Sequence, residues 1–425
     1  GGACSTDETP PAGGVGDGWG TAPSSVSSLL VPPSRRPDGV LEIFLMGGLC
    51  PWDTFYVNPD YGHPDRTDGT ANTQWWTFQE GYGDANLPNV FESRCGGSGQ
   101  PLLTEFGTDS AGSPIHFGPW LLPLRDRPDI LNRLRVVVLS HKFEPHEVAS
   151  PLALTGHTRG ALRMATTGAH VQRHFRGIQS SSQDTPLAYT IFSGDSEIEA
   201  QFDINAASAS GLHPAWARPL ALRLAEDNSA LTSALERSSL NDRASLMDAA
   251  ARTYLNRYAS RYGSSGLGKP MMNRALEEMI QARNALEYAP RLSEVLTPEL
   301  LAPVRGTVAC GSQADLDTTA MGLRMATNLL TRPDRSAKYV TYIDSGLINA
   351  TGAGYDTHEY HVMESSRNIM HLLTYLSVWT NRPGEKNPNK LDLDKHMVLL
   401  TSEFGRTPEP EIGKPLGLDH WPFGY

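Results

Sequence analysis

Short apolar runs, each ending at a loop that carries carboxylates or histidines, constrain this chain more than any other feature of its sequence. The runs occupy residues 40–46, 134–140, 186–193, 339–343 and 397–401. Their length and their content of β-branched and aromatic residues predict buried strands. Helical periods over 315–330 and 361–379 alternate with the later strands. The pattern predicts an α/β fold with a mainly parallel central sheet and helices on both faces.

The rest of the chain divides by composition. Residues 1–37 are rich in Gly, Ser, Pro and Thr, which predicts a flexible leader or stalk. Residues 38–425 then form one domain. Within it, residues 56–118 have little periodicity and indicate a long loop region. Apolar residues at helical spacing after residue 240 predict a helical insertion over about 214–300.

Charge and cysteine usage exclude several classes of protein. The chain has 36 basic and 47 acidic side chains and a net charge of −11, which argues against a nucleic-acid partner. No apolar stretch is long enough to predict a transmembrane segment. The chain begins at Gly1 without a methionine, so we expect a processed, exported protein. Cys4, Cys50, Cys95 and Cys310 form no Cys-x-x-Cys pair, and either disulfides or buried free thiols fit them.

The loops after the apolar runs supply a set of nitrogen and oxygen ligands. They carry Asp53, then His141 and His146, then Asp356 and His358, then Glu403 and Arg406, with Asp419 and His420 near the end of the chain. One such residue alone is usually a turn or cap residue. Ligands bind beyond the carboxyl ends of parallel strands, so several such loops at one edge indicate a metal site. Carboxylates with imidazoles suit zinc, manganese or iron.

These motifs resemble a bacterial family of exported proteins, the domain of unknown function DUF1501, which is grouped with the alkaline phosphatase and sulfatase superfamily. The matching strings are Phe44-Leu45-Met46-Gly47-Gly48 with Asp53-Thr54-Phe55, Thr155-Gly156-His157-Thr158-Arg159-Gly160, Tyr355-Asp356-Thr357-His358, Glu403-Phe404-Gly405-Arg406-Thr407-Pro408 and Asp419-His420-Trp421-Pro422. The resemblance runs from about residue 40 to the last residue. It implies an alkaline-phosphatase-like fold.

The resemblance also implies a metal site. Its ligands would be Asp53, His146, Asp356, His358, Glu403 and His420, around one or two divalent ions of zinc, manganese, iron or calcium. Glu403-Phe404-Gly405 stands where the superfamily has Asp-His-Gly, which removes one imidazole. His146 lies nine residues before Thr155, where the superfamily has its nucleophile. No arginine follows Cys50 in the sulfatase spacing, so a formylglycine sulfatase is not expected.

A metal-bound water can replace a protein nucleophile. In that case His146 or Glu403 would act as the base. Arg406 or Arg159 would clamp a tetrahedral anion, although an ion pair that holds the Glu403 loop fits Arg406 equally well. His141 and His157 are secondary candidates near the site. We expect surface or core positions for His361 and His371.

Two functions follow from these observations. The first is an exported metal-dependent hydrolase of a phosphate or sulfate ester, acting in the periplasm, at the cell surface or outside the cell. Its partner would be a small anionic ester or a surface glycan. The alternative is a non-catalytic metal-binding protein of a surface assembly or a homo-oligomer. An open coordination position distinguishes the hydrolase from a closed structural site.

Overall fold

A five-stranded parallel sheet forms the centre of the protein in the computed structural model. The structure describes residues 31–57, 104–108, 112–156, 166–178, 188–193, 220–229, 231, 233, 253, 294–307, 313–334, 337–347, 354–359, 361–411 and 414–423. The strands are β1 (Gly39–Leu45), β4 (Tyr189–Ser193), β5 (Leu220–Arg223), β8 (Tyr339–Asp344) and β9 (His396–Ser402). Their order across the sheet is β5-β4-β8-β1-β9. The parallel α/β arrangement confirms the expected class of fold.

Strand β1, which lies between β8 and β9, is buried on both of its faces. Its register pairs Leu45 with Asp344 at the end of β8 and with Ser402 at the end of β9. Leu41 and Ile43 belong to the larger hydrophobic cluster, whereas Phe44 belongs to a second cluster on the other face. Such alternation in a strand with almost no exposed residue requires helices on both sides of the sheet.

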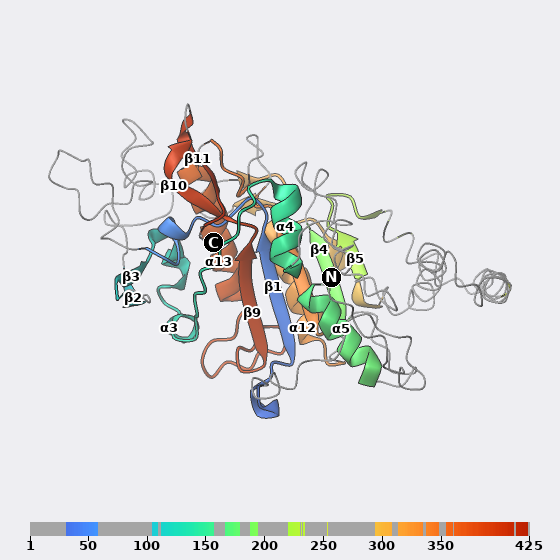
Figure 1. Ribbon diagram of the computed structural model, residues 1–425. Helices are drawn as coiled ribbons and strands as arrows, with labels where there is room; N and C mark the ends of the chain where they lie inside the picture. Colours follow the sequence, from blue (N-terminus) through green and yellow to red (C-terminus); the bar gives the residue numbers. More distant parts are fainter. Residues whose placement is uncertain are drawn as a thin grey trace, which may run out of the picture.

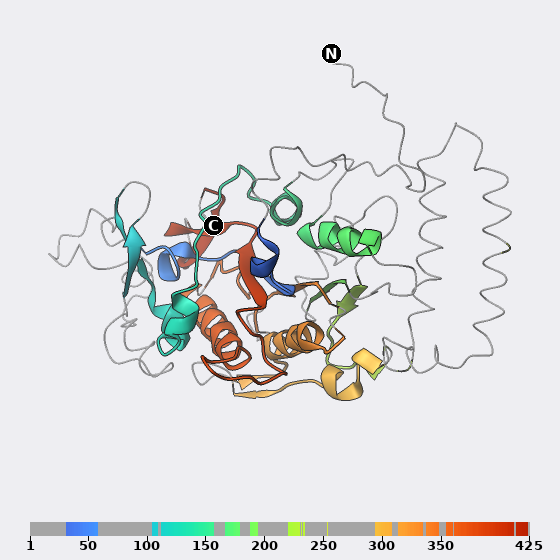
Figure 2. The same ribbon diagram turned by 90° about the horizontal axis from the view of Figure 1, so that it is seen from below.

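Four helices provide that cover (Figures 1 and 2). Helices α12 (Thr318–Thr331) and α13 (His361–Val378) pack on one face, and α4 (His146–Thr155) and α5 (Thr167–Ile178) lie on the other. Helix α12 begins at Thr318, three residues after the predicted start, because the Asp317 carboxylate accepts a hydrogen bond from the Ala320 amide and caps the first turn. No described helix is long and apolar enough to cross a membrane.

Smaller elements surround this core. They are η2 (Pro33–Arg35), η3 (Pro51–Asp53), η5 (Pro119–Leu124), α3 (Pro128–Leu131), α11 (Pro298–Leu301) and the strand pairs β2 (Thr104–Thr108) with β3 (Pro114–Phe117), β6 (Gly306–Thr307) with β7 (Gln313–Ala314), and β10 (Gly405–Glu411) with β11 (Lys414–Trp421). The hairpin β10–β11 follows β9 directly and stands above the carboxyl edge of the sheet (Figure 1).

The predicted strand over residues 134–140 is wrong. This segment has no strand pairing, and Val137, Val138 and Leu139 are about half exposed or more. Its two ends are held by side chains, through an ion pair from Arg133 to Asp394 and a hydrogen bond from the His141 ring to the Glu403 carbonyl. This apolar, β-branched run does not join the sheet, and no described strand pairs with its backbone.

The expected insertion and loop region also differ from the structure where they are described. Strand β5 lies inside the range 214–300 and belongs to the central sheet, so the predicted boundary is wrong at that point. The hairpin β2–β3 lies in the expected loop region 56–118. Most of the predicted helical segment after residue 240, and residues 1–30 of the leader, fall outside the described residues.

A glycine at the exit of β1 allows two loops to touch. Gly47 has φ +114°, and a Cβ at this position would overlap the backbone of Tyr355 and Asp356. We expect Gly47→Ala to lower the free energy of unfolding by about 3 kcal/mol or more, because strained backbone and steric overlap add. Urea denaturation measures this loss. Gly384→Ala is the control, since its φ is +80° but a Cβ there meets nothing within 4 Å. Equal losses in the two variants would contradict the close approach.

Candidate metal centre

Five segments distant in sequence meet at the carboxyl edge of the sheet. They are the exits of β1, β8 and β9, the start of α4 and the hairpin β10–β11 (Figure 1). Because all strands of the sheet are parallel, their carboxyl ends share this edge. The side chains brought together include His146, Asp356, His358, Glu403 and His420, as the sequence predicts.

The Asp356 carboxylate is the centre of the cluster. Its Oδ1 atom lies 3.4 Å from His146 Nε2, 3.2 Å from His358 Nε2 and 3.3 Å from His420 Nε2. Arg406 also donates to this oxygen. The ligand atoms of His146, Asp356 and His420 all lie within 4.8 Å of one another, which is a spacing that one metal ion can bridge.

Two of the imidazoles face each other through ring nitrogens. His358 Nε2 and His420 Nε2 are 3.0 Å apart, so only one of them can carry a proton between them. The other nitrogen presents a lone pair. A nitrogen lone pair beside a carboxylate oxygen is a typical donor arrangement for zinc or a similar divalent ion.

Glu403 holds His146 from behind. Its Oε1 atom accepts from the Gly47 amide at 2.7 Å and lies 2.8 Å from His146 Nδ1. When His146 binds an ion as a neutral ring, the proton stays on Nδ1 and the Nε2 lone pair faces Asp356. Glu403 Oε2 is buried and has no hydrogen-bond partner among the described residues. A buried carboxylate oxygen without a partner is costly, and a bound cation would remove that cost.

Arg406 is fully buried and connects three segments. Its guanidinium donates to the Gly47 carbonyl, to the Asp356 carboxylate and, at 3.0 Å, to the Leu418 carbonyl. The register of β10 and β11 places Arg406 opposite His420. These contacts correspond to the ion-pair role considered for Arg406. Both of its Nη atoms donate hydrogen bonds to oxygen atoms of the protein.

The ring of Phe404 positions two of the histidines. It stacks on His420 with ring centroids 4.1 Å apart, and it lies 4.9 Å from the ring of His146. Phe404 is fully buried, so both imidazoles rest against a rigid apolar wall. This contact explains how a loop of the form Glu-Phe-Gly orients imidazoles that it does not itself supply.

Charges in the cluster shift the protonation of its members. Burial opposes protonation of His146, but hydrogen bonds to Asp356 and Glu403 outweigh it and raise the pKa of His146 to about 9. Burial would raise the pKa of Asp356, yet its hydrogen bonds to three histidines hold that pKa far below the usual range. Burial, with Arg406 and His146 nearby, lowers the pKa of His420. The cluster therefore keeps Asp356 ionised.

Asp53 lies in a second cluster rather than beside Asp356. Its Oδ2 atom is 3.0 Å from the Cys50 thiol and 3.4 Å from His361 Nε2. Neither Cys50 nor His361 is among the site residues that the sequence predicts. The sequence contains a spacing that could have indicated this cluster. Cys50 and Asp53 are three residues apart in a Pro-containing turn, and His361 follows His358 by three residues.

The remaining candidates divide into three groups. His141 contacts the Glu403 backbone and so supports the cluster from outside. His371 is buried and pairs with Asp317 at 2.8 Å, which confirms a core position. His157 and Arg159 lie outside the described residues. Cys50 is a free, buried thiol, and Cys4, Cys95 and Cys310 also lie outside the described residues.

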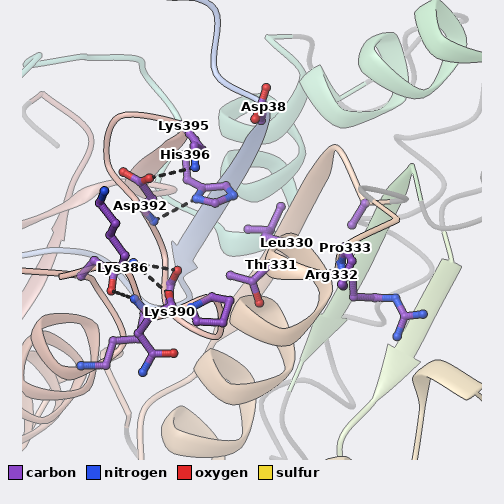
Figure 3. A pocket seen from close by; sticks show the side chains of 14 residues that line it. Asp38, Leu330, Thr331, Arg332, Pro333, Lys386, Lys390, Asp392, Lys395 and His396 are labelled. Atoms are coloured by element: carbon purple, nitrogen blue, oxygen red, sulfur yellow. Dashed lines mark hydrogen bonds and ion pairs between the residues drawn. The ribbon is translucent and has the colours of Figure 1, made fainter.

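A pocket of about 540 Å³ lies at the opposite end of the sheet, around the start of β1 and β9 (Figure 3). Its cations are largely neutralised by neighbours, since Lys390 pairs with Glu385 and Lys395 with Asp392. The pocket is remote from the strand exits where the ligands gather. We therefore assign the candidate site to the carboxyl edge.

Comparison with known proteins identifies no relative of this chain. No protein-family model, no curated protein and no solved structure matches it.

The pKa of His146 predicts how the metal-free protein responds to pH. The folded protein keeps this proton up to about pH 9, whereas an unfolded imidazole loses it near pH 6.5. The stability from His146 is thus complete below about pH 6.5 and disappears as the pH rises through about 9. We expect the wild type to lose on the order of 2 kcal/mol more than His146→Gln over this window, by urea denaturation in chelator.

His170→Gln is the matched control, because His170 is exposed on α5. Its stability should follow the wild type at every pH. If the free energy of unfolding changed with pH in the same way in the wild type and in His146→Gln, the folded protein would not bind the His146 proton more tightly than the unfolded chain does.

Proposed function

We propose that this protein is an exported, metal-dependent hydrolase of a phosphate or sulfate ester, on an alkaline-phosphatase/sulfatase-like fold. The observation that carries the proposal is the convergence of three imidazole nitrogens on Asp356 Oδ1 at the carboxyl edge of a parallel sheet. The resemblance of the sequence motifs to the DUF1501 family supports the same fold and an exported location. The ion would be zinc, manganese, iron or calcium.

The cluster is open to solvent on one side. The side chain of Asp356 is 24% exposed and that of His358 is 27% exposed, whereas Glu403 is fully buried. An ion held by Asp356 and the histidines would therefore keep a position that water or a substrate can reach. Such an open position is what a catalytic site requires and a structural site lacks.

Each residue of the cluster has a distinct role in this proposal. Asp356, His146, His358 and His420 would hold the ion. When bound, a divalent ion lowers the pKa of a water molecule and polarises the ester oxygen. Glu403 keeps the proton of His146 on Nδ1, and Arg406 fixes the Asp356 carboxylate. With one ligand carboxylate among neutral imidazoles, the bound site is positive and attracts an anionic ester.

The alternative is a non-catalytic metal-binding protein of a surface assembly. It is favoured by one observation: Arg406, the described arginine nearest the ligands, is buried and already bonded to protein groups. A tetrahedral anion would then find no free guanidinium in the described part of the site. Under this alternative the ion stabilises the joined strand exits, and the partner is a surface glycan or another copy of the chain.

Metal content and hydrolysis together test the proposal. We expect the wild type, purified without chelator, to contain a divalent ion by inductively coupled plasma mass spectrometry. Asp356→Ala and His420→Ala should lose that ion, because each removes a ligand of the cluster. Hydrolysis of p-nitrophenyl phosphate or p-nitrophenyl sulfate by the wild type should fall in parallel with the metal content.

His170→Ala should retain both the ion and the activity, since His170 is exposed and follows Gly168, which packs against Tyr189 at the opposite, amino end of β4. Loss of metal from Asp356→Ala, with no hydrolysis of either ester class by the loaded wild type, would favour the structural alternative. Full metal content in Asp356→Ala and in His420→Ala would refute the ligand assignment itself.

Glu403 tests the orienting role separately. We expect Glu403→Gln to weaken zinc binding about 10- to 100-fold, because an amide is a poorer acceptor for the His146 proton than a carboxylate. Competition with a chromophoric chelator measures the change. Glu144→Gln, an exposed change close in sequence to His146, should bind as the wild type does. Unchanged affinity in Glu403→Gln would show that Glu403 does not orient the ligand.

A further inference from the structure

A short turn after β1 places a thiol and a carboxylate side by side. The turn η3 begins after Cys50, with Pro51 at its first position, and ends at Asp53. In a 3-10 turn, residues three apart lie on the same side. Accordingly Cys50 Sγ lies 3.0 Å from Asp53 Oδ2. Thr54 donates to the Cys50 carbonyl at 2.7 Å and holds the turn closed.

The imidazole of His361, which is distant in the sequence, lies beside this thiol and carboxylate. His361 is the first residue of α13, and its Nε2 atom lies 3.4 Å from Asp53 Oδ2. The ligand atoms of Cys50, Asp53 and His361 all lie within 4.8 Å of one another. The ring of Trp120 covers His361 at a centroid distance of 5.5 Å.

The far side of the His361 ring has the partners of a metal ligand. The hydroxyl of Thr357 contacts His361 Nδ1, and the hydroxyl of Ser365 lies 3.3 Å from the same nitrogen. Either hydroxyl oxygen can accept a hydrogen bond from Nδ1–H, and in that tautomer the Nε2 lone pair of His361 faces Asp53 and Cys50. A ligating histidine typically donates its other nitrogen in this way.

Burial and charge favour a cation that displaces the thiol proton. Cys50, Asp53 and His361 are each at most 2% exposed. A divalent ion with one thiolate, one carboxylate and one neutral imidazole has no net charge, so it can be buried at low cost.

We infer that Cys50, Asp53 and His361 form a second metal site, which binds a thiophilic divalent cation, with zinc the best fit. Thiolate, imidazole and carboxylate are all zinc ligands, and the thiolate disfavours calcium and magnesium. The three side chains are buried, so a buried water molecule rather than a substrate would fill the fourth position of a tetrahedral zinc ion. The site ties the exit of β1 to the start of α13, so its function is structural. The inference does not depend on hydrolysis at the Asp356 cluster.

Cobalt spectroscopy tests this site directly. The full chain is stripped of metal with a chelator and reloaded with Co²⁺ alone. We expect a near-ultraviolet band of thiolate-to-cobalt charge transfer in the wild type, because Cys50 would bind the ion. Cys50→Ser should lose the band and about one equivalent of zinc per chain. His361→Asn should also lose the zinc, and it tests the site without changing a thiol.

Asp356→Ala separates this inference from the proposed function. It should lose the ion of the open cluster but keep the thiolate-to-cobalt band. A wild type without the band would overturn the inference, even if the open cluster binds metal. A band that persists in Cys50→Ser would assign the thiolate to Cys4, Cys95 or Cys310 and would also overturn it. Far-ultraviolet circular dichroism confirms that each variant is folded.

Discussion

The buried guanidinium of Arg406 joins the segments that build the carboxyl edge of this protein. It donates to the exit of β1 at Gly47, to Asp356 after β8 and to Leu418 on the hairpin β10–β11. A buried charge is costly unless it is paired and hydrogen-bonded, so the contacts of the two Nη atoms favour the arrangement in which these segments meet. The positions of the three imidazoles around Asp356 depend on that arrangement, because all three contact the carboxylate that Arg406 holds in place.

The two clusters at this edge differ in a way that suits different tasks. The Asp356 cluster has a partly exposed carboxylate and a partly exposed imidazole, so an ion there would meet solvent. The cluster of Cys50, Asp53 and His361 is buried beneath Trp120. An open site can exchange ligands, whereas a closed site can only stabilise the fold. The proposed hydrolase would thus combine a catalytic ion and a structural ion at the exits of neighbouring strands.

Particular segments show where sequence reasoning reaches its limit. The runs that became β1, β4, β8 and β9 were predictable, because each is short, rich in apolar residues and ends near a glycine or polar loop, although the edge strand β9 is only partly buried. The run 134–140 has the same composition but remains unpaired with exposed valines. Residues 220–223 have no such run, yet they extend the sheet beside β4. Strand pairing depends on a partner distant in sequence, and local composition does not contain that information.

The sequence by itself determined the class of fold and the edge at which the ligands gather, because alternating strands and helices make a parallel sheet whose exits lie together. It also determined most members of the Asp356 cluster, since their motifs directly follow the strands. Only the tertiary structure decided which of these side chains lie close enough to hold one ion together. Asp53 faces Cys50 and His361 because a 3-10 turn rotates it away from Asp356. Glu403 stands behind His146 because side-chain direction, unlike strand order, is set by packing.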